Sequence, residues 1–244
     1  MTTDIGLARS YGRSAGEKRP TVLTREYVDS AAGSCLVETG RTRVLCAVTV
    51  EDRAPAWLKG SGRGWVTAEY AMLPASTAKR TPREWRGRKG RSMEIERLIG
   101  RSLRTVCDLT ALGGEVTFHV DCDVIQADGG TRTASITGAW VALHDAIEKQ
   151  RAIGKISGNP LTGQVAAISA GKVGGRLLLD LDYQEDSSAE VDLNVVMDAN
   201  GGIIEVQGTG ESTPFTRGEL DRLLDMAAVG IGELQAAQRE ALAG

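Results

Sequence analysis

The sequence predicts a mixed α/β protein made of two halves of similar order, and three observations support this. In the first hundred residues, short apolar runs alternate with glycine-containing turns, as in β-strands; the runs cover residues 35–38, 43–50 and 65–70. Further along, apolar side chains recur every three or four residues, which is typical of helices. From about residue 160, strands followed by a helix begin again. We therefore expect a duplicated α/β (α+β) architecture, with subdomains 1–153 and 154–244.

The remaining elements are expected from spacing and from end signals. A first helix begins near Ser92, a suitable N-cap, and carries Ile95, Leu98, Ile99, Leu103 and Val106 on one face. A strand over residues 116–125 leads through Gly129 and Gly130 into a second helix over residues 133–150. In the second half, strands are expected at 165–169, 177–181, 191–197 and 203–206. Thr216 and Glu219 form a capping-box pattern that starts the final helix.

Composition limits the class of protein. Of 244 residues, 41% are hydrophobic, which is enough for a sizeable core and argues against disorder. No apolar run reaches the length of a membrane span, and the polar N-terminus lacks a signal peptide's apolar stretch. We therefore expect a cytoplasmic protein with no membrane partner. The four cysteines lack a CxxC pair and are expected to be reduced and buried.

The distribution of charge is more informative than the net charge of −3. Residues 79–104 hold ten Lys or Arg against three acids, whereas residues 177–200 hold seven acids and no base. One basic and one acidic stretch suggest an anionic ligand and a cation. Seven bases in residues 79–91, a polar segment containing Pro82, favour an exposed loop that contacts a polyanion over a merely solvated one. Trp85 is able to stack on a base, which alone is weak evidence.

The sharpest local motif is the turn over residues 128–133, between a predicted strand and a helix. Unpaired N–H groups at a helix N-terminus bind anions, and Gly129 and Gly130 let a phosphate approach the backbone closely. Thr131 adds a hydroxyl donor, and Arg132 adds a forked, charged one. Taken alone, however, a double-glycine turn is more often just a turn.

A carboxylate cluster over residues 185–192 suits a hard cation such as Mg²⁺, which takes oxygen ligands. Along a straight strand Asp186 and Asp192 would lie about 20 Å apart. The chain must therefore fold back near Ser187 and Ser188 if both are to share one ion. On this evidence alone, a solvated acidic loop is the more common case.

Other catalytic classes lose support. No GxSxG, HExxH or Walker motif occurs, and the two histidines, His119 and His144, lie mid-strand and mid-helix, where structural roles are more common. A phosphate site, a cation site and a basic surface remain. That combination suits phosphoryl chemistry in which bound phosphate is the attacking group.

Five strings together resemble the bacterial ribonuclease PH family. They are residues 62–74 (GRGWVTAEYAMLP), 90–101 (GRSMEIERLIGR), 121–138 (DCDVIQADGGTRTASITG), 185–197 and 204–209 (IEVQGT). The match spans about residues 20–240. The sequence departs from the family in three places. Arg9-Ser10-Tyr11-Gly12-Arg13 lacks the Asp of the usual R-x-D-G-R opening, Ala75 stands where a basic residue is common, and the Arg-rich loop is about one residue short before Gly90.

The resemblance implies roles for particular residues. Arg91, Gly130, Thr131 and Arg132 would bind the attacking phosphate; Asp186 and Asp192 would be catalytic and hold Mg²⁺; Arg80 and Arg83 would hold RNA. It also implies a duplicated βαβ-rich fold, related to the ribosomal protein S5 domain 2-like fold, and a homohexamer built as a trimer of dimers.

The activity implied is phosphate-dependent 3′→5′ trimming of tRNA precursors, which releases nucleoside diphosphates and is reversible as nucleotidyl transfer. The alternative is a non-catalytic RNA-binding ring subunit of an exosome-like assembly. A third, weaker alternative is a generic nucleotide-binding enzyme.

Overall fold

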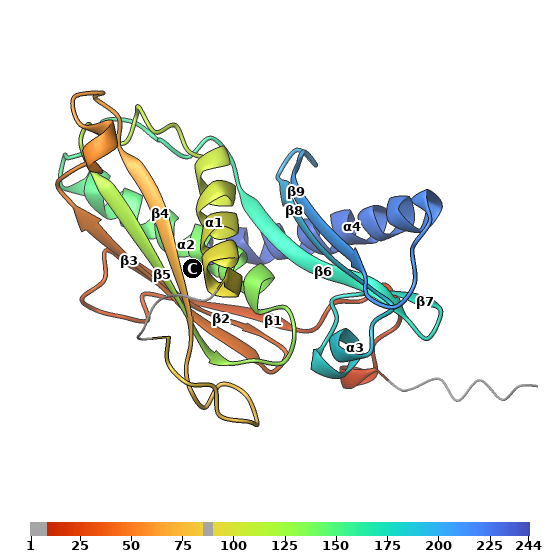
Figure 1. The fold of residues 1–244 in the computed structure, drawn as a ribbon. Coiled ribbons are helices and arrows are strands. Elements are labelled where there is room, and N and C mark those ends of the chain that lie inside the picture. Colours follow the sequence, from red (N-terminus) through yellow and green to blue (C-terminus); the bar gives the residue numbers. More distant parts are fainter. Residues whose placement is uncertain (1–8, 85–89) are drawn as a thin grey trace, which may run out of the picture.

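The computed structural model describes residues 9–84 and 90–244 and contains two β-sheets with helices packed on them (Figure 1). In chain order the elements are η1 (Ser10–Gly12), β1 (Thr21–Arg25), β2 (Gly33–Thr39), β3 (Thr42–Glu51), η2 (Ala56–Leu58), β4 (Trp65–Met72), α1 (Gly90–Thr105), β5 (Thr117–Gln126), α2 (Thr131–Ala152), β6 (Val165–Val173), β7 (Arg176–Leu179), α3 (Tyr183–Ser187), β8 (Val191–Asp198), β9 (Ile203–Gly210) and α4 (Arg217–Ala243).

The first sheet has the strand order β1-β2-β3-β5-β4. Its strands pair antiparallel except for β4 and β5, which are parallel from Trp65↔Thr117 to Met72↔Val124. A parallel pair needs a crossover, and α1 is part of the connection between β4 and β5. Because of this topology, the N-terminus of α1 lies near the end of β4 that carries Tyr70, close to where β5 leads into α2.

The second sheet has the order β7-β6-β8-β9, and all of its pairs are antiparallel. Helix α4 packs against it through Leu223, Ala227, Ile231 and Leu234. Asp192 on β8 lies opposite Thr209 on β9, and Asn194 lies opposite Gln207. These polar positions lie near the end of the sheet where α3 precedes β8.

Helix α2 joins the two halves. Nearly every residue from Thr131 to Ile147 is buried, as expected of a helix covered on all sides. The main hydrophobic core contains residues of β2, β3 and β5 together with Val165, Ala167 and Val196 of the second sheet. The N-terminus of α2 therefore lies where the two halves of the molecule meet.

Most expected elements are confirmed, including the four strands of the second half and the capping box of Thr216 and Glu219. The sequence reading missed β1 and α3. It was also wrong about the start of the first helix, because α1 begins at Gly90, and the buried Ser92 donates a hydrogen bond from Oγ to Glu84 Oε1 at 3.1 Å.

Two further expectations concern cysteines and membranes. All four cysteines are free and buried, as predicted. Within residues 9–84 and 90–244, none of the helices has the length and apolar character needed to cross a bilayer.

Candidate anion and cation site

The turn before α2 has a backbone conformation that requires glycine at positions 129 and 130. Gly129 and Gly130 have φ values of 75° and 67°, which favour glycine. A Cβ on Gly129 would lie 2.5 Å from the Leu181 carbonyl oxygen, so a side chain there is also sterically excluded. Gly130 is the N-cap, and no side chain caps the helix. The hydroxyl of Thr133 instead donates to the Gly130 carbonyl at 2.9 Å. The first turn of α2 therefore keeps its positive end available to an anion.

Thr131 occupies the first position of α2 and is held from the neighbouring strand. Its Oγ1 lies 2.8 Å from the Tyr70 hydroxyl, and both side chains are buried. Burial raises the pKa of Tyr70, while the hydrogen bond to Thr131 and the charges of Arg91 and Arg132 partly offset that increase. Tyr70 thus stays protonated at neutral pH and orients the threonine hydroxyl.

Arg132 lies in the first turn of α2, and partners from two other elements fix it. Its Nη1 donates to Gln207 Oε1 at 2.6 Å and to Glu94 Oε1 at 3.2 Å. Gln207 Nε2 in turn donates to Glu94 Oε1 at 2.9 Å. Nε and Nη2 of Arg132 make no hydrogen bond to residues of the described ranges, so these donors are available to an anion.

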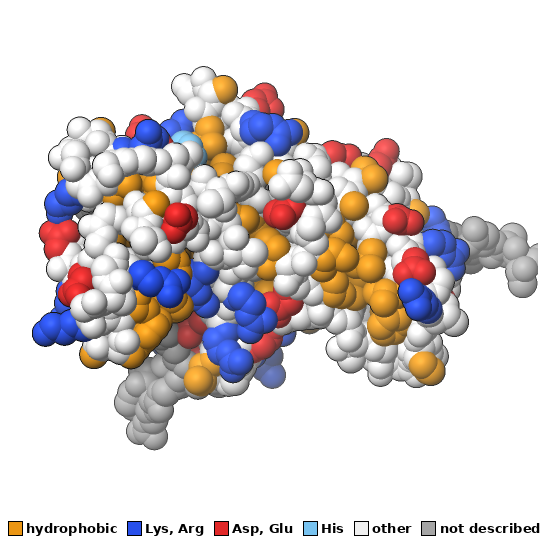
Figure 2. Space-filling model, turned by 90° about the horizontal axis from the view of Figure 1, so that it is seen from above, with side chains coloured by type: hydrophobic (Ala, Val, Ile, Leu, Met, Phe, Trp, Pro, Cys, Tyr) orange, Lys and Arg blue, Asp and Glu red, His pale blue; other side chains and the backbone are white. Residues whose placement is uncertain are grey.

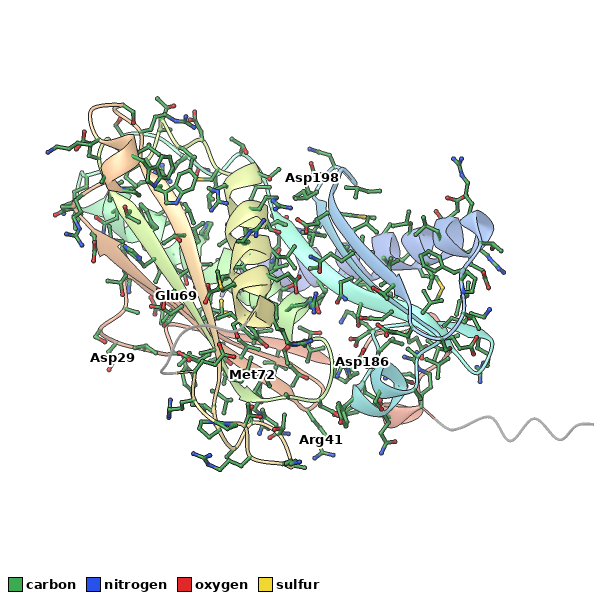
Figure 3. The ribbon with its side chains drawn as sticks, viewed as in Figure 1. Asp29, Arg41, Glu69, Met72, Asp186 and Asp198 are labelled. Atoms are coloured by element: carbon green, nitrogen blue, oxygen red, sulfur yellow. The ribbon has the colours of Figure 1, made fainter. Side chains whose placement is uncertain are left out.

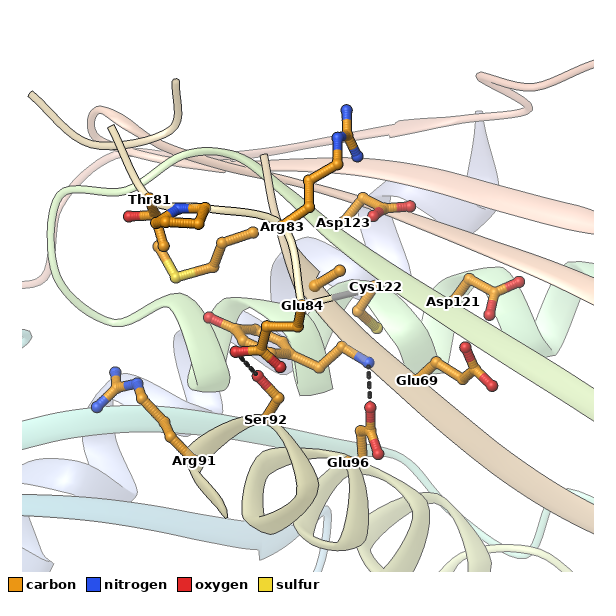
Figure 4. Close-up of a pocket in the computed structure, with 14 residues that line it drawn as sticks. Glu69, Thr81, Arg83, Glu84, Arg91, Ser92, Glu96, Asp121, Cys122 and Asp123 are labelled. Atoms are coloured by element: carbon orange, nitrogen blue, oxygen red, sulfur yellow. Dashed lines mark hydrogen bonds between the residues drawn. The ribbon is translucent and has the colours of Figure 1, made fainter. Parts of the chain in front are cut away.

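Arg91 lies in the first turn of α1, and its exposed guanidinium forms no ion pair with any residue in the described parts of the chain. Its positive charge acts on both Tyr70 and Asp186, so it lies close to both. Arg91 also lines a cavity of about 620 Å³ between β4, β5 and α1. In Figure 4 it stands at the end of that cavity opposite Glu69 and Asp121.

Asp186 and Asp192, the two acidic residues predicted from the sequence, lie close enough for their charges to interact, because the chain turns back between them. Asp186 lies on the one-turn helix α3, and Asp192 is the second residue of β8. Figure 3 labels Asp186 beside α3. Burial, together with the negative charge of Asp186, raises the pKa of Asp192 to about 6. Burial also raises the pKa of Asp186, and the charges of Arg91 and Arg132 partly offset that.

The carboxylate pair fits a divalent cation that is shared with a substrate. Mg²⁺ commonly uses one or two protein carboxylates, several waters and substrate phosphates. A cation between Asp186 and Asp192 would relieve the repulsion that raises the pKa of Asp192. Residues 9–84 and 90–244 contain no group of three or more His, Cys, Asp or Glu side chains arranged to hold a metal. Two carboxylates would leave the other ligand positions of such an ion to substrate and water.

A clamp from the N-terminal segment holds α3 in place. Arg9 donates to Glu185 through Nε at 2.6 Å and through Nη2 at 3.1 Å, and also to the Leu179 carbonyl. Arg13 reaches the Asp180 carbonyl at 2.7 Å and Glu185 at 3.4 Å. Glu185 also completes a capping box with Asp182. Arg9 and Arg13 of the divergent opening motif, residues 9–13, thus stabilise the position of α3. Tyr11, which lies between them, is exposed and has a positive φ.

Arg80 and Arg83 lie in an exposed segment outside helices and strands, between β4 and α1, as expected of a loop. Arg83 lines the same cavity as Arg91, and its charge acts on Asp123. The predicted stacking residue, Trp85, lies outside the described residues, as do three of the seven bases of the stretch, Arg86, Arg88 and Lys89.

The structure therefore gathers Arg91, the Gly130–Arg132 turn, Asp186 and Asp192, while Arg80 stands apart on the loop. Sequence reasoning missed four side chains that support them: Tyr70, Glu94, Gln207 and Glu211, the last of which adds negative charge near both aspartates. The strings of the resemblance contain the first three, but pairing across β4, α1 and β9 is visible only in three dimensions.

Comparisons with known proteins show the family to which the chain belongs. The model of the 3′ exoribonuclease family, domain 1, matches residues 17–147, and that of domain 2 matches residues 163–230. The chain belongs to the 3′ exoribonuclease (RNase PH) family. The match to domain 1 includes the turn over residues 128–133, which is expected to bind phosphate and is called the phosphate turn below. The match to domain 2 includes Asp186 and Asp192, called the acidic pair below.

Solved structures of similar fold include subunits from two exosome structures and rice Rrp46. A subunit in the Archaeoglobus fulgidus exosome with RNA bound to the active site is 23% identical, with a TM-score of 0.80, covering 94% of this chain and 92% of that one. Rice (Oryza sativa) Rrp46 is 21% identical, with a TM-score of 0.77 and coverages of 95% and 98%. An archaeal exosome core subunit is 22% identical, with a TM-score of 0.76 and coverages of 93% and 90%.

Proposed function

We propose that this protein is a phosphate-dependent 3′→5′ exoribonuclease that shortens RNA, including tRNA precursors, and releases nucleoside diphosphates. One observation carries the proposal: Arg91 and Arg132, from different helices, lie close enough to Asp186 in the other half of the molecule to act on its charge, and Arg132 also acts on Asp192. A phosphate and a cation are the pair of ligands that such a site would hold together.

The reaction uses inorganic phosphate as the nucleophile. A phosphate oxygen attacks the phosphorus of the last phosphodiester, the bond to the preceding 3′ oxygen breaks, and that oxygen takes up a proton. Arg91, Arg132 and the N–H groups at the start of α2 bind the attacking phosphate and offset charge on the phosphoryl oxygens. Thr131, oriented by Tyr70, adds a hydroxyl donor.

Asp186 and Asp192 act at the opposite side of the site. Both would hold Mg²⁺, which when bound supplies positive charge that stabilises the leaving 3′ oxygen. Because one phosphoryl bond replaces another of similar energy, the reaction also runs as nucleotidyl transfer. Arg80 and Arg83 would contact RNA phosphates upstream of the reacting end, which holds the strand without reading its sequence.

A second candidate function is a non-catalytic, RNA-binding subunit of an exosome-like ring. The comparisons favour it at least as well, since the similar solved structures are exosome subunits. The acidic pair close to two arginines supports catalysis, because a subunit that only binds RNA does not need these four charged side chains close together. The two candidates differ in one measurable property, which is turnover by the isolated chain.

Exposed apolar side chains are one feature of the surface that suits contacts between subunits. Large apolar side chains are exposed, among them Trp57 at 67%, Ile153 at 65% and Val229 at 62%. Figure 2 shows hydrophobic side chains gathered between charged ones on one face. Exposed apolar surface of this kind favours subunit contacts. We propose a homohexamer, a trimer of dimers, which sedimentation of the purified chain would test.

The decisive experiment incubates the purified chain with a short 3′-tailed RNA and Mg²⁺, with and without inorganic phosphate. We expect nucleoside diphosphates only when phosphate is present. Monophosphates released without phosphate would indicate a hydrolase. RNA binding without any product, in a chain that has assembled into a ring, would favour the non-catalytic subunit.

A further inference from the structure

Arg19 is a fully buried arginine that no step of the proposed reaction uses. Its side chain is 0% exposed, yet it carries a charge and five N–H donors. Nη2 and Nε bind the two carboxylate oxygens of Asp180 at 2.7 and 3.0 Å. The remaining contacts go to backbone carbonyls: Nη1 donates to Asp128, and Nη2 also approaches Gly129 at 3.4 Å and Leu181 at 3.2 Å.

Two of these carbonyls belong to the phosphate turn. In a trans peptide the C=O and N–H groups point in opposite directions. A donor that holds the carbonyls of Asp128 and Gly129 therefore turns the N–H groups of Gly129 and Gly130 away from itself. Neither N–H group donates to another residue of the described ranges. They point away from Arg19 and are available to an anion at the start of α2.

Thr42 acts on the same turn from the other side. Its Oγ1 donates to the Gly129 carbonyl at 2.7 Å and accepts from the Asp128 N–H at 2.9 Å. The residue is 0% exposed, so its hydroxyl is unable to reach a substrate. Arg19 and Thr42 together fix two consecutive peptide planes of the turn.

The other end of the Arg19 network leads to the acidic pair. Asp180, which has a φ of 55°, and Leu181 directly precede α3, the helix that carries Asp186. Burial opposes ionisation of Asp180, but the hydrogen bonds and charge of Arg19 outweigh it and lower the pKa of Asp180. One ion pair thus connects the segment before α3 to the phosphate turn.

We propose that Arg19 and Thr42 are positioning residues that orient the backbone N–H groups of the phosphate turn. Through Asp180, Arg19 also holds that turn in a fixed position relative to α3, the helix that carries Asp186. This inference rests on the proposed function and deepens it. Neither residue touches substrate. A merely structural ion pair would stabilise the fold without setting the affinity for phosphate, and that difference is measurable.

The test compares phosphate affinity in matched variants. Arg19→Lys keeps the positive charge beside Asp180 but loses the guanidinium N–H groups that contact the carbonyls of Asp128 and Gly129. Thr42→Val keeps the shape but loses the hydroxyl, and Thr42→Ser restores it. Arg25→Lys is the control, because Arg25 forms a comparable bidentate pair with Asp145 (both contacts 2.9 Å) on the far side of the fold. Each variant is checked for assembly by sedimentation and for melting temperature.

We expect Arg19→Lys to raise the KM for phosphate, and its calorimetric Kd, about tenfold, with the KM for RNA changed less than about twofold. Thr42→Val should raise both phosphate constants by about threefold or more, and Thr42→Ser should restore them. Arg25→Lys should lower the melting temperature and leave phosphate affinity unchanged.

Unchanged phosphate constants in folded Arg19→Lys and Thr42→Val would overturn the inference. If Arg19→Lys does not fold, the Thr42 pair decides the matter alone. Absence of phosphate binding by the unaltered chain would instead remove the proposed function and this inference with it. If the unaltered chain is a phosphate-dependent enzyme and the Arg19→Lys and Thr42→Val variants keep its phosphate constants, only this inference is wrong and the proposed function stands.

Discussion

The phosphate turn and the acidic pair face each other across one site, but the protein treats them differently. Two carbonyls and one hydroxyl of the turn have partners: Arg19 binds the Asp128 carbonyl, Thr42 binds the Gly129 carbonyl, and Tyr70 is hydrogen-bonded to Thr131. The two aspartates have almost none, since the one side-chain hydrogen bond to either of them within the described ranges is from Asn194 to Asp192 at 3.4 Å.

The difference shows how each half of the site is prepared for its ligand. The turn is held by residues of the protein itself, so the proposed binding of an anion would need little rearrangement. The carboxylates are partly buried and repel each other, and the pKa of Asp192 rises to about 6. The proposed cation would offset the negative charge of the two aspartates. Variants on the two sides should therefore fail in different ways.

The largest effect is expected from the acidic side. Asp186→Asn and Asp192→Asn keep the shape but lose the charge that a cation needs, and should lower kcat about 100-fold or more while RNA affinity stays nearly unchanged. Steady-state kinetics and filter binding measure the two quantities. Wild-type turnover of either variant in Mg²⁺ would remove the metal role from that residue.

The next effect belongs to the phosphate side. Arg91→Ala removes a charged donor that has no other partner in the described ranges, and should raise the KM for phosphate about 10- to 100-fold on every RNA tested. Arg97→Ala is a matched control, because Arg97 is exposed on the same helix, nearly two turns further along. Equal losses in both variants would mean that Arg91 acts only through general charge.

A smaller and substrate-dependent effect is expected from the loop. Arg80→Ala combined with Arg83→Ala should raise the KM for a folded tRNA precursor about tenfold, with less effect on a two-nucleotide substrate and a weaker dependence on salt. The exposed Arg176 on β7 provides a control of the same chemistry. Sedimentation must accompany the kinetics, since the loop can also contact another subunit. Equal losses on long and short RNA would remove the RNA-holding role.

The smallest effect should come from Tyr70→Phe. It deletes the hydroxyl that orients Thr131 but keeps the ring in the core, so we expect the KM for phosphate to rise about threefold and kcat to change little. Thr131→Val should do at least as much, because it removes the donor itself. If Tyr70→Phe shifts the KM for RNA instead, the tyrosine serves a different ligand.

Much of the secondary structure could be predicted from the sequence alone. Apolar periodicity and glycine turns gave β5, α2 and all four strands of the second half, because those segments carry their own burial pattern and end signals. The double glycine before α2 gave the turn, since a left-handed backbone favours glycine. Strand β1 was missed because its residues alternate between half-buried and exposed at a sheet edge, so no strong apolar run marks it.

Tertiary structure decided how the site is assembled. Asp186 and Asp192 act on each other only because the one-turn helix α3 reverses the chain before β8, and Arg9 and Arg13 hold that helix from about 170 residues away in sequence. The roles of Arg19 and Gln207 depend on contacts between the two halves. Such contacts leave no periodic trace in a single sequence, because they depend on which strands pair and on where α2 is buried between the two sheets.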